Sequence, residues 1–124
     1  MQDEPKPGEL TKAVADFLRN DIAPLVSGHH AFKLLVAINA LDLVTRQLTL
    51  ERGADAAEGA RLAALLGTQG SLLELNQALA ERIASGELDL GTPGLTEHLW
   101  QTTMEKLAVD QPNYGSYKRE LGKI

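Results

Sequence analysis

The segment from Ala31 to Leu50 carries apolar side chains around nearly the whole circumference of a helix. At 100° per residue, the apolar positions on one side are Phe32, Leu35, Val36 and Leu43, and those on the other are Leu34, Ala37, Leu41, Val44 and Leu48. A helix that is apolar all round is typical of the middle of a group of packed helices. We therefore expect this segment to be the central helix of an all-α protein.

Helices are also predicted before and after this segment. Apolar residues at helical spacing follow Pro7, a residue that the first turn of a helix tolerates. Pro24 ends or kinks this first helix, because proline has no backbone donor and its ring clashes with the preceding turn. A third helix is predicted from about Asp55 to Leu66, since Gly67 is typical of the position after a helix end.

Two more helices are predicted in the second half of the chain. Ser71 and Glu74 have the spacing of a capping box, in which each side chain accepts a hydrogen bond from the other residue's backbone N–H. The fourth helix therefore starts there, and it ends near Gly86. Thr92 before a proline predicts the start of a fifth helix, which must end before Pro112. No segment alternates with the period of two that is typical of strands.

The length and composition predict one domain. A chain of 124 residues with 44% hydrophobic content is long enough to form a compact core. We expect a single helical domain over residues 1–124, with a bundle of about five helices ordered over about residues 8–112 and a polar C-terminal arm over residues 113–124. No apolar run reaches the ~18 residues of a membrane span, and the first ten residues lack the order of a signal peptide, so we expect a cytoplasmic protein.

Charge and residue content argue against several classes of function. The net charge of −5 opposes binding to nucleic acid, and no membrane partner is expected. The chain has no cysteine, and the adjacent His29 and His30 would point about 100° apart on a helix, so neither a metal site nor a cofactor is predicted. No serine lies in a nucleophile motif. We predict no catalytic residues. A hydrolase or transferase stays an alternative, which would require Asn39, Asp42, Arg46 and Lys106 to line a pocket.

A polar stripe in the central helix is the candidate site. Asn39, Asp42 and Arg46 fall within a narrow sector of one helix face, and Asp42 precedes Arg46 by the four residues that favour an ion pair. Buried polar groups cost several kcal/mol unless they are hydrogen-bonded, so these groups need partners. Lys106 and Asp110, again four residues apart, are candidate partners on the fifth helix.

Two interpretations of this stripe stay open. In the first, Arg46 meets Asp110 and Asn39 bonds to a neighbouring backbone, so that the network determines which helices pack together. In the second, part of the network opens on a groove and binds a ligand or a protein partner. The sequence alone does not decide between them.

Four stretches carry a resemblance to a known family. They are "AVADFL", "VAINAL" followed by Arg46, "LAALLG" and "KLAVDQPNY". In this order they resemble a bacterial family of small uncharacterised all-helical proteins. On that pattern Asn39, Arg46, Lys106, Asp110, Pro112 and Tyr114 occupy characteristic positions. Gln47 and Asn113 depart from it, since an acidic and a basic residue are expected there.

The resemblance implies a biological context. Members of the family are typically encoded beside, or fused to, acyl-CoA dehydrogenases and kinases that resemble aminoglycoside phosphotransferases. The implied function is a non-catalytic accessory or interaction module in acyl-CoA metabolism, with such an enzyme or a second copy of the chain as its partner. The residues proposed for this network are Asn39, Asp42, Arg46, Lys106, Asp110 and Tyr114.

A second resemblance supports an alternative function. The stretch "YGSYKRELG" is similar to the "YG-x-YK" stretch of acyl-CoA-binding proteins, which are also small acidic helical proteins. The alternative is therefore a carrier of acyl-CoA or a related anionic ligand. Lys106, Lys118 and Arg119 would then bind phosphate groups, and a crevice between helices would hold the acyl chain.

Overall fold

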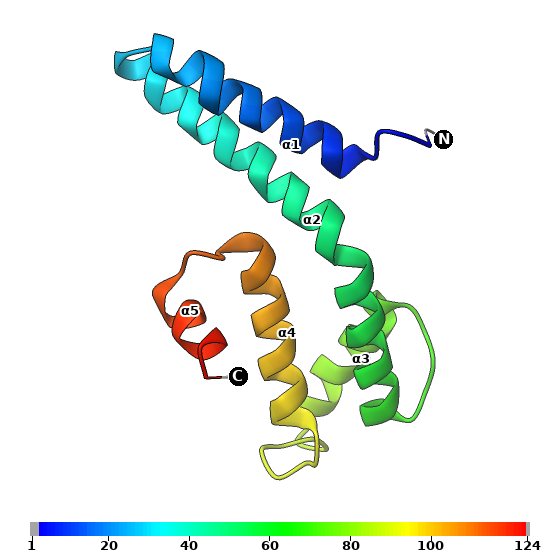
Figure 1. Ribbon diagram of the computed structural model, residues 1–124. Coiled ribbons are helices and arrows are strands. Elements are labelled where there is room, and N and C mark those ends of the chain that lie inside the picture. Colours follow the sequence, from blue (N-terminus) through cyan, green and yellow to red (C-terminus); the bar gives the residue numbers. More distant parts are fainter. Residues whose placement is uncertain (1–2, 124) are drawn as a thin grey trace. The chain divides into compact units, whose positions relative to one another are not determined.

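The structure, a computed structural model, describes residues 3–123, and the regular secondary structure in this range is helical (Figure 1). Its elements in order are α1 (Pro7–Phe17), the π-helical turn η1 (Leu18–Ile22), the 3-10 turn η2 (Ala23–Leu25), α2 (Gly28–Leu66), α3 (Leu72–Ala84), α4 (Leu95–Asp110) and α5 (Gly115–Leu121). The predicted all-α class is confirmed, because residues 3–123 contain five α-helices and no strand. The chain forms two compact units, residues 1–51 and 52–124, which are described separately below.

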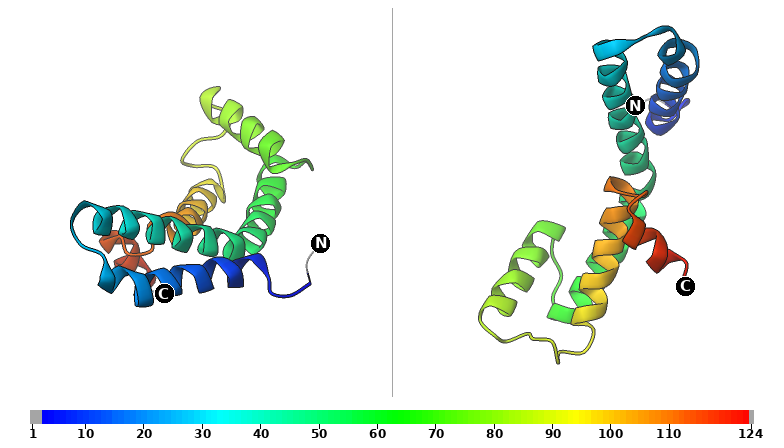
Figure 2. Two further views of the ribbon diagram at one scale, coloured as in Figure 1. Left: turned by 90° about the horizontal axis from the view of Figure 1, so that it is seen from above. Right: turned by 90° about the vertical axis from the view of Figure 1, so that its left-hand side faces the viewer.

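The N-terminal unit is an antiparallel helical hairpin. α1 lies beside the first part of α2, as the views in Figures 1 and 2 agree. The Thr11 and Thr45 hydroxyls are hydrogen-bonded across the pair at 2.7 Å, and Ala15 and Ile38 are buried there. Pro24 cannot donate a backbone hydrogen bond, so the regular helix ends before it, as predicted, and the chain turns through η1 and η2.

The C-terminal unit has the larger apolar core. The second part of α2 contributes Leu62 and Leu66, α3 contributes Leu75 and Leu79, and α4 contributes Leu95. These five side chains are 0–6% exposed. Burying a leucine contributes roughly 1.5–3 kcal/mol relative to leaving it in water, so this cluster is the main source of stability in this unit.

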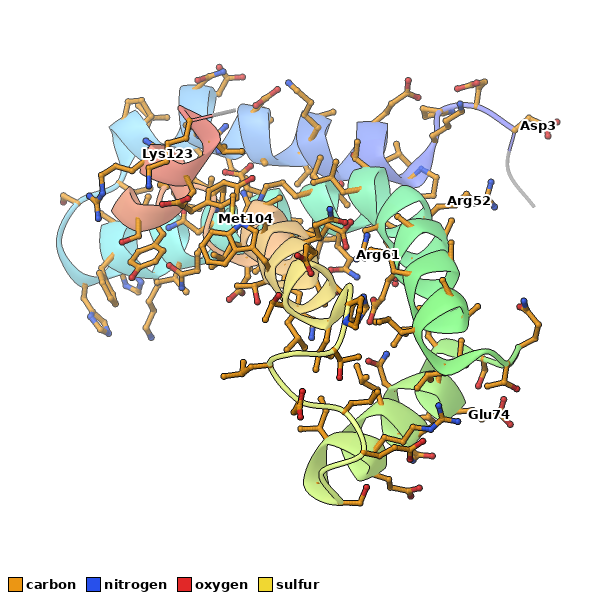
Figure 3. All side chains as sticks on the ribbon, turned by 90° about the horizontal axis from the view of Figure 1, so that it is seen from below. Asp3, Arg52, Arg61, Glu74, Met104 and Lys123 are labelled. Atoms are coloured by element: carbon orange, nitrogen blue, oxygen red, sulfur yellow. The ribbon has the colours of Figure 1, made fainter. Side chains whose placement is uncertain are left out.

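The predicted start of α3 is confirmed. The Ser71 Oγ accepts a hydrogen bond from the Glu74 N–H at 3.2 Å, and a Glu74 carboxylate oxygen accepts one from the Ser71 N–H at 2.9 Å. The hydrogen bonds from Ser71 lower the pKa of Glu74 below its ordinary value. Glu74 is labelled in Figure 3 at the start of this helix. The two residues therefore satisfy backbone donors that the first turn of a helix leaves free.

Several predicted boundaries differ from the structure, and the first is the start of α2, which lies at Gly28 rather than at Ala31. The break predicted between Leu50 and Asp55 is wrong, because α2 continues through both segments. Gly53 lies inside this helix, where glycine costs only about 1 kcal/mol relative to alanine, and its neighbours favour the helix. α4 begins at Leu95 rather than at Thr92, after a turn in which Gly94 has a left-handed backbone with φ 86°. The polar arm predicted over residues 113–124, for which the sequence allowed one helical turn, contains the seven-residue helix α5.

Candidate interaction surface

One side of α2 in the N-terminal hairpin presents an apolar patch to solvent. Phe32, Leu35 and Val36 are 65%, 54% and 52% exposed. Asn39 follows on the same flank of the helix and is also exposed. We call these four residues the Phe32 patch. The central helix is therefore not covered all round within its own unit, because α1 covers α2 only along the line through Ile38.

A row of ion pairs borders the Phe32 patch. Arg19 of the η1 turn donates to Asp42 of α2 at 2.5 Å and to Asp16 of α1 at 3.0 Å, and Lys12 donates to Asp16 at 2.7 Å. The hydrogen bond from Lys12, together with the charge of Arg19, holds the pKa of Asp16 below its ordinary value. Asp42 lies three residues beyond Asn39, so this row runs along the same flank of the hairpin as the patch. The patch thus has a charged rim.

The residues of the predicted polar network are divided between the two units. In the N-terminal unit, Asp42 contacts Arg19, a residue that the sequence analysis did not select. Arg46 is half-buried on the same flank of α2. A pairing between Arg46 and residues of the C-terminal unit stays a prediction.

The remaining predicted residues lie in the C-terminal unit. Lys106 and Asp110 are exposed at the end of α4, and Tyr114, at 52% exposure, precedes α5. Lys118 and Arg119, the cations of the alternative ligand site, are exposed on α5. The Arg119 guanidinium donates to the Ser116 hydroxyl at 2.8 Å.

A polar cluster that the sequence analysis missed joins α2 to α4 in the C-terminal unit. Arg61, labelled in Figure 3, donates to both carboxylate oxygens of Glu105 at 3.1 and 2.9 Å, to the Thr102 hydroxyl at 3.2 Å and to His98 Nδ1 at 3.2 Å. Its partners are spaced four and three residues apart, so they share one face of α4. That spacing is a signal readable from the sequence. Because its members bond to one another, the cluster serves to join the two helices.

His98 is neutral within this cluster. It is 2% exposed, and its Nδ1 accepts the Arg61 N–H, so the proton of the neutral ring is on Nε2. Burial lowers the pKa of His98 below its ordinary value, and the Arg61 charge lowers it further. The carboxylates of Glu58 and Glu105 act in the opposite direction.

The free energy of unfolding of the C-terminal unit is expected to fall as the pH drops below about 6.5. The unfolded chain protonates His98 near that pH, whereas the folded chain, with its lower pKa, does not. The stabilisation is therefore present above the ordinary pKa and is lost as the pH falls toward the folded pKa, by at most about 1.4 kcal/mol per pH unit. Unfolding followed by the fluorescence of Trp100, the single tryptophan, measures this.

The control is His98→Gln, because glutamine offers an acceptor to Arg61 but does not titrate. Its unfolding free energy is expected to change less than that of the wild type between about pH 7.5 and pH 5.5. Equal pH dependence in the two proteins would mean that another group is responsible.

Two other features are absent from the residues that the structure describes. Over residues 3–123, no group of three or more His, Cys, Asp or Glu side chains is arranged to hold a metal ion. Within the same range, none of the helices combines the length and apolar character required to cross a bilayer.

Comparison with known proteins identifies the family of this chain. The sequence profile of a domain of unknown function, DUF6285, matches residues 24–114. The chain belongs to the DUF6285 family. The matched residues contain the Phe32 patch and the Arg61 cluster, whereas α1 and α5 lie outside the matched range of the DUF6285 profile. No curated protein and no solved structure matches the chain.

Proposed function

We propose that this DUF6285 protein is a non-catalytic interaction module that docks on an enzyme of acyl-CoA metabolism through the Phe32 patch. The observation that carries the proposal is the exposure of Phe32, at 65%, beside Leu35 and Val36. Covering the rest of a phenylalanine side chain contributes on the order of 2 kcal/mol to binding, so this residue is a suitable anchor for a partner.

The surroundings of Phe32 are also those of a protein interface. Interfaces combine an apolar centre with a polar rim that provides hydrogen bonds. Here the Asn39 amide lies within the patch and the ion pair of Arg19 with Asp42 borders it. The partner surface should therefore be apolar at its centre and should offer hydrogen-bonding groups at its edge.

The resemblance described above supplies the expected partners. They are an acyl-CoA dehydrogenase or a kinase resembling aminoglycoside phosphotransferases, encoded next to the gene of this protein. The proposal assigns the chemistry to that enzyme and the docking surface to this chain. It is consistent with the position of the Phe32 patch inside the family match.

Co-expression with the neighbouring enzyme tests this proposal. We expect the two proteins to elute together with the mass of a complex. Phe32→Glu is expected to weaken the complex at least about tenfold, because a carboxylate would then be buried in an apolar contact. Titration of the purified enzyme with each variant measures the dissociation constant.

The matched control is Lys33→Glu. Lys33 is the next residue along the helix, is also exposed, and has a side chain that points about 100° away from Phe32, while the substitution changes the charge more than Phe32→Glu does. This variant should bind within about threefold of the wild type, since its side chain lies outside the patch. The proposal fails if neither neighbouring enzyme binds, or if both variants bind as the wild type does.

A further inference from the structure

A second apolar surface lies on the other side of the hairpin. Five side chains contribute to it, and between 41% and 52% of each is exposed. They are Leu10, Val14 and Phe17 of α1 and Val44 and Leu48 of α2. We call this set the hairpin face.

The Thr11–Thr45 hydrogen bond shows that the two helices present this surface together. Val14 lies three residues after Thr11 and Leu48 three residues after Thr45, so each shares a helix flank with its threonine. Because the two hydroxyls meet at 2.7 Å, the two flanks adjoin. The ion pair of Arg19 with Asp42 lies along the opposite flank, beside the Phe32 patch. The hairpin face is therefore two helices wide and separate from that patch.

The composition of the hairpin face limits what can cover it. Its five residues are uncharged, and so are Leu18, Leu34 and Leu41, which lie closer to the line of contact between the helices. Such a surface has no charge with which to select a partner, so its complement must be similarly apolar and similarly wide. A second copy of the chain supplies a surface that meets both requirements, and a two-fold axis would bring the same patch from each copy together.

The exposed area of the hairpin face is large enough for an interface with a second copy of the chain. The exposed parts of the five side chains amount to on the order of 500 Å² of apolar surface per copy. Two such faces would bury about 1,000 Å² before the surrounding polar residues are counted, and stable interfaces bury about 1,200–2,000 Å² in total. Two hairpins packed face to face would form a layered group of four helices, an arrangement that helices with one apolar flank favour.

We infer that the protein forms a homodimer in which the hairpin faces of two copies pack against each other. This inference goes beyond the proposed docking function and uses a different surface. Sedimentation equilibrium of the full chain over about 1 µM to 1 mM tests it. The mass is expected to approach twice the 13.4 kDa of one chain, and a single-chain mass throughout would overturn the inference.

The decisive variant is Val14→Glu combined with Val44→Glu, which should raise the dissociation constant of the dimer about a hundredfold or more. Lys12→Gln combined with Asn39→Glu is the matched control, since it changes the net charge by the same amount at exposed positions on the opposite flank of each helix and should leave the dimer unchanged. Equal association of the two variants would contradict the inference. Far-UV circular dichroism verifies that both remain helical.

A crosslinking measurement does not depend on the folding of the double variant. The chain has no cysteine, so Val44→Cys introduces a single thiol at the centre of the predicted interface. Oxidation should link two copies of Val44→Cys much more than two copies of Asn39→Cys, which carries its thiol on the opposite flank of α2, and equal linkage would count against the dimer. Docking on the neighbouring enzyme is measured separately with Phe32→Glu, so the failure of one proposal leaves the other intact.

Discussion

Leu62→Ala is expected to lower the free energy of unfolding of the C-terminal unit by about 3 kcal/mol. Leu62 is 0% exposed and lies in the cluster formed by α2, α3 and α4. Its replacement removes apolar contacts and leaves a cavity that rigid neighbours fill only in part. Urea unfolding followed by Trp100 fluorescence measures the change.

The control for this substitution is Leu73→Ala, the same change at a position on α3 that is 69% exposed. Because Leu73 loses little contact on truncation, we expect its effect to stay within about 0.5 kcal/mol. Similar losses for both variants would show that the core does not lie where the structure places it.

Arg61→Ala is expected to destabilise the same unit by about 2–3 kcal/mol. The substitution removes four hydrogen bonds and strands the Glu105 carboxylate and the His98 ring beside α2. Loss of one partner from a fully buried ion pair costs about 3–5 kcal/mol. Here the Arg61 and Glu105 side chains are 20% and 29% exposed, so water compensates in part for the lost partner. The same urea experiment measures the effect.

Two variants serve as references for the Arg61 prediction. Arg52→Ala changes an exposed arginine on the same helix and should alter stability by no more than about 0.5 kcal/mol. Arg61→Lys keeps the charge but loses the planar guanidinium that binds both oxygens of Glu105. Its loss of unfolding free energy should therefore lie between the losses of Arg61→Ala and Arg52→Ala. If Arg61→Ala is as stable as Arg52→Ala, the cluster does not support the fold.

Local signals predicted most helix ends correctly. Ser71 and Glu74 indicated the start of α3 because a capping box depends on residues only three positions apart. The two helices predicted over residues 31–50 and 55–66 are one helix, because the helix propensity of the residues around Gly53 outweighs the cost of a single glycine. Sequence periodicity therefore predicts that a helix exists more reliably than it predicts where the helix ends.

The contacts between distant residues were harder to predict. No partners were predicted for Arg61, although His98, Thr102 and Glu105 have the spacing of one helix face. Pairing that face with Arg61 depends on how α2 and α4 pack, which no local pattern specifies. Similarly, the apolar circumference of α2 suggested a surrounded helix, whereas Phe32 is exposed because α1 covers only one side.

The most direct test of the account measures whether the Phe32 patch is open to solvent in the isolated protein. Since the chain lacks cysteine, Phe32→Cys and the exposed reference Gln47→Cys each carry one reporting thiol. We expect the two thiols to react with a small alkylating reagent at rates within about threefold of each other. We also expect the neighbouring enzyme to protect only Phe32→Cys. A Phe32→Cys thiol that reacts at least about tenfold more slowly in the isolated protein would contradict the account, because the patch would then already be covered.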